Sequence, residues 1–276
     1  MFVDFGTTRA TYETFVDESH DFDVTGPESV LRGLTADDLV FDFCADDLTG
    51  LADGATVGDW VARRGGLTAA GTGTPEYTAP DSTLGVPSVA YAASGDIHET
   101  PATIDWSTYD EATILGVHYT ESVSGVSRGM SLAAGALSIG DQNGRGLGTY
   151  RVDGKITGLH YTDEVEAGGF WFERDNVVDS PLAVTVVTHS LQAQAAASLI
   201  EVFVDGEEQE GTGSGDSSQG DAWQSDLRVR LGGEDATASQ NGLDGRLHRF
   251  VAMPRALSAD NAVQACDLLT RLAKAV

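Results

Sequence analysis

The sequence predicts an all-β protein: an antiparallel sandwich of two sheets, with a short C-terminal helix and an N-terminal arm. Composition is the first observation, because the 276 residues include 33 glycines and many short β-branched runs, which is typical of numerous short strands. The second is the near absence of helical spacing before the C-terminus. The third is the length, which suits one large all-β domain or two small domains. Short strands followed by one helix indicate a two-layer sandwich.

The first 38 residues differ from the rest of the chain. Their aromatic residues are scattered among acids and threonines without the regular spacing of a core-forming element. These residues are Phe2, Phe5, Tyr12, Phe15 and Phe22. We expect residues 1–38 to form an arm that becomes ordered against a partner protein or another copy of the chain, and residues 39–276 to form the sandwich. The alternative is one or two strands that complete the main sheet.

The sandwich begins with a run in which Leu39, Phe41 and Phe43 fall on one face of a strand. In the run 226–231 the apolar residues face inward, and Arg228 and Arg230 face outward. The expected strands cover residues 39–44, 87–91, 112–119, 128–139, 149–152, 169–173, 182–189, 199–204, 226–231 and 246–253.

Turn and helix signals separate these strands. Asp205-Gly206 suits a type I′ hairpin turn, since both central residues need positive φ. The Gly-, Ser-, Glu- and Gln-rich residues 206–223 predict a mobile loop. Near the C-terminus, Ser258 is a candidate N-cap and Asp260 lies in the first helical turn. The apolar residues at helical spacing are Ala262, Val263, Cys266, Leu269 and Leu272.

The charge indicates adaptation to very salty water. There are 43 acidic against 16 basic residues, a formal net charge of -27, and Lys155 and Lys274 are the only lysines. Such self-repulsion destabilises a compact state in dilute buffer, and molar salt screens it. The alternative is an ordinary acidic mesophilic protein. The charge disfavours nucleic acid as a partner and disfavours anionic membranes.

The chain carries no membrane-spanning pattern, because no apolar run approaches the roughly 18 residues that a span needs. Its first residues lack the basic region and apolar core of a secretory signal. We therefore expect a protein that works inside the cell, or that leaves the cell by assembly into a virus particle. Cys44 and Cys266 are too few for a disulfide framework. They either form one bond or are two buried thiols.

Four groups of residues resemble the concanavalin A-like, laminin-G-type jelly roll. Taken together, their order and spacing are more specific than any one of them, and they extend over residues 39–276. They are Phe41–Gly54 with Val57–Trp60; Pro75–Tyr77 with Gly85–Tyr91; Ile200–Glu207; and Leu231–Gly233 with Leu243–Phe250 and Arg255–Ser258. The resemblance implies a jelly-roll sandwich. Similar domains serve carbohydrate recognition, adhesion and subunit contact on cell-surface proteins, viral fibres and capsid appendages, and some relatives are glycoside hydrolases.

The hydrolase alternative has weak support in the residues. Retaining cleavage needs two carboxyl groups about 5 to 5.5 Å apart. Glu201 and Asp205 have a suitable interval, but Phe203 lies between them on the same face and Asp205 is needed in the turn. Glu164 and Glu166 share a face in a segment with few strand signals. No Gly-x-Ser-x-Gly elbow or His-Glu-x-x-His spacing occurs. We therefore expect that the protein is not an enzyme.

Some relatives hold calcium in loops beside the concave sheet, and calcium prefers oxygen ligands. Asp141 and Asn143, in a Gly-containing loop, are the first candidates. A second candidate set is Asp175, Asn176 and Asp179. Because a strongly acidic chain produces such clusters by chance, no cofactor is certain and Ca²⁺ is the one considered.

Sugar recognition requires aromatic rings beside planar polar groups. The candidates are Tyr150 with Arg151, and Trp171, which strand alternation places opposite Phe170 and Phe172. Part of the second cluster must be core. Trp60 and Trp106 are expected to be core or strand-edge anchors.

These observations favour a non-catalytic structural or glycan-recognising, receptor-binding protein on the virion surface of a virus of a halophilic archaeon. Residues 1–38 would contact other virion proteins or copies of the chain, and the sandwich would meet a host glycan or glycoprotein. The alternative is a cellular carbohydrate-binding or adhesion module at the cell surface. A glycoside hydrolase is the third.

Overall fold

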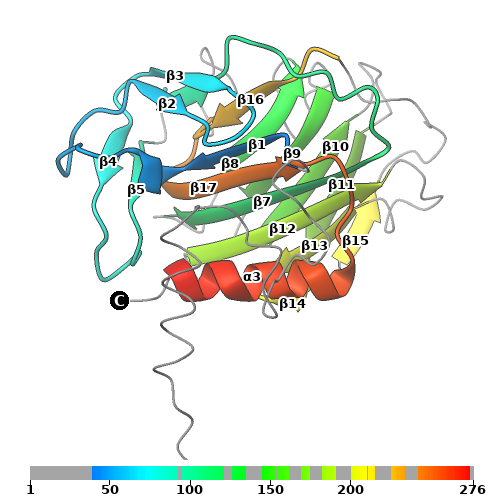
Figure 1. Cartoon of the computed structure of the whole chain (residues 1–276). Helices are drawn as coiled ribbons and strands as arrows, with labels where there is room; N and C mark the ends of the chain where they lie inside the picture. Colours follow the sequence, from blue (N-terminus) through cyan, green and yellow to red (C-terminus); the bar gives the residue numbers. More distant parts are fainter. Residues whose placement is uncertain are drawn as a thin grey trace, which may run out of the picture.

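The computed structural model describes residues 39–92, 95–120, 126–134, 145–152, 155–161, 169–174, 182–190, 200–209, 211–214, 225–233 and 242–273. The expected arm, residues 1–38, lies outside these ranges. Over the described residues the chain is a sandwich of two antiparallel sheets with one α-helix (Figure 1). The fold class predicted from the sequence is therefore confirmed. No helix among the described residues is long and apolar enough to cross a membrane.

The first sheet, sheet A, has eight strands among the described residues. Seven of them follow the order β14-β13-β12-β7-β17-β5-β4, and β1 pairs with β17 beside β5. Their bounds are β1 Phe41–Cys44, β4 Glu76–Thr78, β5 Ser88–Tyr91, β7 Glu111–Thr120, β12 Leu182–Ser190, β13 Ile200–Val204, β14 Glu207–Glu208 and β17 Gly245–Met253. Strands from both ends of the described chain, β1 and β17, therefore lie side by side.

The second sheet, sheet B, has nine strands among the described residues, in the order β15-β11-β10-β9-β8-β16-β6-β3-β2. Their bounds are β2 Asp59–Val61, β3 Thr68–Thr72, β6 Ile97–Glu99, β8 Val126–Ala134, β9 Arg145–Val152, β10 Lys155–Tyr161, β11 Gly169–Arg174, β15 Gly211–Ser214 and β16 Arg228–Leu231. Every pairing in both sheets is antiparallel.

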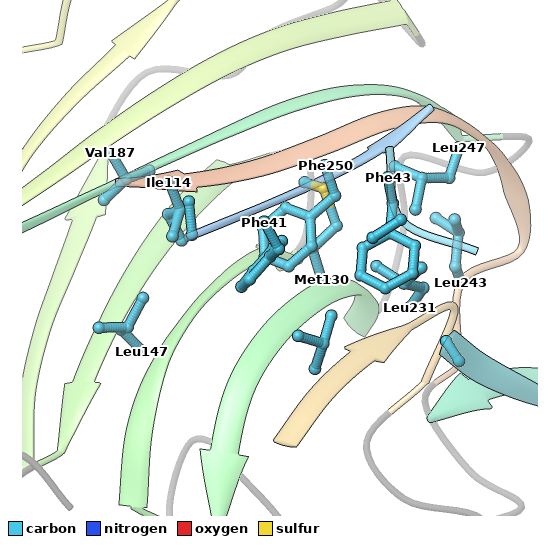
Figure 2. Close-up of a cluster of buried hydrophobic side chains, with 14 of the residues drawn as sticks. Phe41, Phe43, Ile114, Met130, Leu147, Val187, Leu231, Leu243, Leu247 and Phe250 are labelled. Carbon is cyan, nitrogen blue, oxygen red and sulfur yellow. The ribbon is translucent and has the colours of Figure 1, made fainter. Parts of the chain in front are cut away.

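The main core fills the space between the sheets (Figure 2). Phe41 lies 5.8 Å from Phe43 and 5.3 Å from Phe250, measured between ring centroids. Trp60 and Trp106 are fully buried, which confirms them as anchors. Truncation of a buried Phe or Trp to Ala typically costs about 3–5 kcal/mol, so this aromatic cluster is a major source of stability.

The helix α3, Ala259–Ala273, covers the face of sheet A that points away from sheet B (Figure 1). Its apolar side packs against residues of β7, β12, β13 and β17 in a second, smaller core. The backbone N–H of Asn261 donates to Ser258 Oγ at 3.4 Å, so the predicted N-cap is confirmed. Cys266 is buried in this layer, whereas Cys44 is buried at the end of β1, and both are free thiols.

The Asp205-Gly206 turn joins β13 to β14 as predicted, with φ of 51° and 88°. Asp205 Oδ1 accepts a hydrogen bond from the backbone N–H of Val184 at 3.0 Å. A Cβ on Gly206 would collide with the Asp267 carboxylate of α3, so the turn is held close to the helix.

The residues after this turn differ from the expected loop over 206–223. Residues 207–208 form β14, which pairs with β13, and residues 211–214 form β15, which pairs with β11 of sheet B. Strand pairing satisfies backbone groups that a loop would leave to water. Residues 215–223 of the expected loop lie outside the described ranges. Arg230 faces away from the core between the sheets, as predicted, because its neighbours Val229 and Leu231 face that core. It is nevertheless only 5% exposed. The Glu99 carboxylate on the neighbouring strand β6 accepts a hydrogen bond from its guanidinium.

Candidate functional site

Tyr150 and Trp171, two of the predicted sugar-binding residues, occupy backbone positions on one face of sheet B. Tyr150 pairs with Thr157 of β10, and Trp171 pairs with Leu159 of the same strand. Since paired residues share a face and residues two apart along a strand do too, both positions face the same way. Strand spacing and rise place them roughly 12 Å apart.

Arg151, the third predicted residue, follows Tyr150 in β9 and therefore has the opposite parity. Arg151 lies four residues after Leu147 in the same strand, so its position is on the same face as Leu147, which is buried in the core between the sheets. Tyr150 and Trp171 thus fall on the outer face of sheet B, whereas Arg151 occupies a core-side position near the strand end. Asp141 and Asn143 of the predicted calcium loop lie outside the described residues, as does the second calcium candidate.

A row of paired positions connects the outer face at Trp171 with a polar cluster. From Leu159, the register runs to Gly148, then to Ser131 of β8, to Arg230 of β16 and to Glu99 of β6. This row crosses the middle of sheet B. It adds polar residues to the same face as the two aromatic positions.

The polar end of the row is an arginine–carboxylate cluster. Glu99 accepts from Arg230 Nε at 2.6 Å and from Arg228 at 3.0 Å. Arg228 is 43% exposed, so one arginine reaches solvent while Arg230 does not. Ser131 Oγ is buried and has no hydrogen-bond partner among the described residues. An unsatisfied buried hydroxyl is uncommon, because it loses water without compensation.

The acid pair considered for hydrolysis lies on a different face. Val202 and Val204 face the core between the sheets, so Glu201, Phe203 and Asp205 face α3. Thr188 Oγ1 donates to Glu201 at 3.4 Å, and Asp205 belongs to the turn against the helix. This pair is therefore structural.

A second cluster of chemically active side chains lies where β1 meets β17. Cys44 Sγ is 3.4 Å from Asp46 Oδ2 and 3.9 Å from His248 Nε2. His248 Nδ1 is 2.7 Å from the carbonyl oxygen of Pro87. Burial raises the pKa of the Cys44 thiol to about 12 and lowers the pKa of His248, which the nearby Asp46 opposes. The thiol is therefore protonated and the imidazole neutral at ordinary pH.

A buried ion-pair network surrounds this cluster. Asp42, fully buried, accepts two hydrogen bonds from Arg249 and lies 3.9 Å from Arg63. Arg63 makes two bonds of 2.9 Å to Asp47. Burial alone would lower the pKa of Arg249, but the negative charge of Asp42 raises it above its usual range. Both guanidinium groups thus have carboxylate partners.

Another buried histidine, His98, lies inside the sandwich. Its Nε2 is 3.2 Å from the carbonyl oxygen of Val57, so this nitrogen donates, and Tyr91 Oη donates to Nδ1 at 3.0 Å. Burial lowers the pKa of His98 to about 4. The side chain is a satisfied, neutral core residue.

Sequence reasoning missed the Cys44 and His248 cluster, because the two residues are separated by 204 positions. The only local signal is Cys44-Ala45-Asp46 at a strand end. The pairing of β1 with β17 brings it to His248, and that pairing joins the two ends of the sandwich.

No protein-family model and no curated protein sequence matches this chain. Solved structures with a similar fold include a mutant Trypanosoma rangeli sialidase with trans-sialidase activity (11% identity, TM-score 0.59) and a T. rangeli sialidase with sialic acid (11%, 0.55). The matches cover 96% and 98% of this chain, respectively. This chain spans only 39% and 40% of the length of the two sialidase chains. The receptor-binding domain of a botulinum neurotoxin C/D mosaic serotype is 10% identical with a TM-score of 0.54, covering 84% of this chain and 52% of its own. The TM-scores show a shared β-sandwich fold, compatible with the concanavalin A-like resemblance.

Proposed function

We propose that this chain is a non-catalytic module that recognises a glycan on the outer face of sheet B. The observation that carries the proposal is the row across that sheet. Along this row the aromatic positions Tyr150 and Trp171 share a face with Glu99 and with its solvent-exposed partner Arg228. Aromatic rings bind the apolar faces of sugars, and charged planar groups accept and donate hydrogen bonds to hydroxyls. A span of roughly 12 Å suits an oligosaccharide more than a single sugar.

The similar structures support a recognition role. They include a sialidase solved with sialic acid and the receptor-binding domain of a neurotoxin. This chain corresponds to less than half the length of the sialidase chains. Glu201 accepts a hydrogen bond from Thr188, and Asp205 accepts one from the Val184 N–H in the turn. These structural contacts favour binding without hydrolysis.

We also propose that the module works on the virion surface of a virus that infects a halophilic archaeon, with residues 1–38 as its docking segment. The acidic, lysine-poor composition supports a salty environment. Deletion of residues 1–38 should leave a folded sandwich that no longer assembles. Circular dichroism and analytical ultracentrifugation test this, and loss of the fold would make the segment part of the core. A cellular adhesion module remains the alternative.

A glycan array in molar KCl tests the recognition claim. Wild type should bind a defined set of acidic or neutral oligosaccharides. Trp171→Ala and Tyr150→Ala should each reduce binding about fivefold, since an aromatic contact contributes about 1 kcal/mol. Tyr77→Ala is the control, because Tyr77 lies on β4 of sheet A, away from the outer face of sheet B, and packs against the core between the sheets. If no glycan on the array binds, or if Tyr77→Ala loses as much binding as the two test variants, recognition by this face is contradicted. Release of reducing sugar that Glu201→Gln abolishes would favour the hydrolase.

A further inference from the structure

The cluster of Cys44, Asp46 and His248 has the shape of a metal site. The three ligand atoms lie within 4.8 Å of one another. In a tetrahedral zinc site, bond lengths of about 2.3 Å to sulfur and 2.0–2.1 Å to nitrogen or oxygen separate the ligand atoms by about 3.6 Å. The separations from Cys44 Sγ are 3.9 Å to nitrogen and 3.4 Å to oxygen. The arrangement therefore needs little movement to hold an ion.

The imidazole of His248 is already oriented as a ligand. The Pro87 carbonyl can only accept, so Nδ1 of His248 carries the proton and Nε2 presents its lone pair toward Cys44. A backbone carbonyl on the second nitrogen is the usual support of a metal-binding histidine.

A β-bulge aims the same residue. The register of β17 against β7 shifts between Leu247 and Arg249, which leaves His248 as the extra residue. Leu247 and Phe250 both face the core between the sheets as a result. Bulges commonly re-aim a side chain at functional sites, and this one turns His248 toward the end of β1.

The charges around the cluster suit a divalent cation. Arg249 and Arg63 are paired with Asp42 and Asp47. Cys44 would release its thiol proton to solvent as the ion binds. The resulting thiolate and Asp46 would then supply the negative charges that a dication needs. Cys44 is fully buried, whereas Asp46 is partly exposed and provides an entry path for the ion.

We propose that Cys44, Asp46 and His248 bind a zinc-class divalent ion, with water as the fourth ligand. A thiolate and an imidazole select zinc or cobalt over calcium or magnesium. A Cys–His nucleophile is the competing interpretation, but a fully buried thiol cannot meet a substrate. The ion would connect β1 and the 3₁₀ turn η2, Ala45–Asp47, to β17, and so join both ends of the sandwich.

Cobalt titration tests the site directly. Purified full-length protein, reduced and stripped with a chelator in molar KCl, should bind one Co²⁺ with thiolate-to-cobalt charge transfer in the near ultraviolet and intense visible bands of tetrahedral cobalt. Zinc should displace the cobalt and abolish the spectrum. Absence of the charge-transfer band, or bands of an octahedral ion only, would overturn the proposal.

Variants assign the ligands. Cys44→Ser should remove the charge-transfer band, and Cys266→Ser, the other buried thiol, should keep it. Asp46→Asn should weaken cobalt binding at least tenfold, and because Asp46 is partly exposed this variant should still fold. His98→Gln is the control for His248→Gln, since both histidines are buried against a backbone carbonyl. Unchanged affinity in Asp46→Asn, together with a retained band in Cys44→Ser, would refute the site.

Discussion

The buried pair of Asp42 and Arg249 yields the sharpest stability prediction. Arg249→Met removes a guanidinium that makes two hydrogen bonds to a carboxylate with no solvent exposure. Breaking a buried ion pair from one side costs about 3–5 kcal/mol, because the remaining charge stays buried and unpaired. Arg63, 3.9 Å from Asp42, compensates in part, so we expect about 3 kcal/mol.

That loss is large against a total stability of about 5–15 kcal/mol. In a domain of this size it should lower Tm by about 10 °C. Urea unfolding in about 2 M KCl, where surface charges are screened, should show the destabilisation as a lower urea midpoint. The dependence of the unfolding free energy on urea concentration should not change. Since the pair is buried, the loss should not change with salt concentration.

Arg246→Met is the matched control, because Arg246 pairs with Asp81 at 2.6 Å near the surface. This partly exposed pair should contribute about 1 kcal/mol or less, and salt should weaken it. A cost for Arg249→Met no larger than that of the control would refute the reasoning. The combined Asp42→Leu and Arg249→Met variant should recover stability relative to Arg249→Met alone.

Three further predictions concern the core, a turn and the solvent. Burial depresses the pKa of His98 from 6.5 to about 4, so the unfolded chain binds the proton before the folded chain does. The free energy of unfolding should therefore fall by about 3 kcal/mol as pH drops from 6.5 to 4. His98→Gln should flatten the plot of urea midpoint against pH over that window, and an unchanged plot would contradict the assignment. Gly206→Ala should lower the free energy of unfolding by about 1–2 kcal/mol, because φ is 88° and the added Cβ meets Asp267. Gly58→Ala, with open space around the added Cβ, should be nearly neutral in the same urea assay. The fold should loosen below about molar salt as screening of the net charge of -27 fails; circular dichroism that is constant down to dilute buffer would contradict adaptation to salt.

Much of the sandwich was predictable because its long strands carry strong local patterns. The runs at β7, β12 and β17 are apolar or β-branched over many residues, and the structure places strands there. The Ser258 cap and the Asp205-Gly206 turn depend on near neighbours only, so both were predictable too.

Short strands escaped prediction for a physical reason. The strands β2, β3, β4 and β6 contain three to five residues each, too few for alternation to show. Their pairing depends on partners elsewhere in the chain. The strand β10 alternates weakly, with a glycine in its middle, and pairs on both sides.

The candidate sites illustrate the same limit. Tyr150 and Trp171 could be proposed from residue type, but their common face depends on the register of β9, β10 and β11. The Cys44–His248 contact arises from a long-range pairing and a bulge that no local pattern encodes. Arg230 was expected at the surface from alternation, and the Glu99 carboxylate on β6 allows its burial.

Hydrogen exchange with and without a glycan that the array identifies tests the central claim most directly. Measured by mass spectrometry in molar KCl, the bound glycan should slow exchange in residues 145–174, which contain β9, β10 and β11, and in β16. Exchange in α3 and β13 should not change. Protection confined to α3 and β13, or no protection at a saturating glycan concentration, would contradict recognition on the outer face of sheet B.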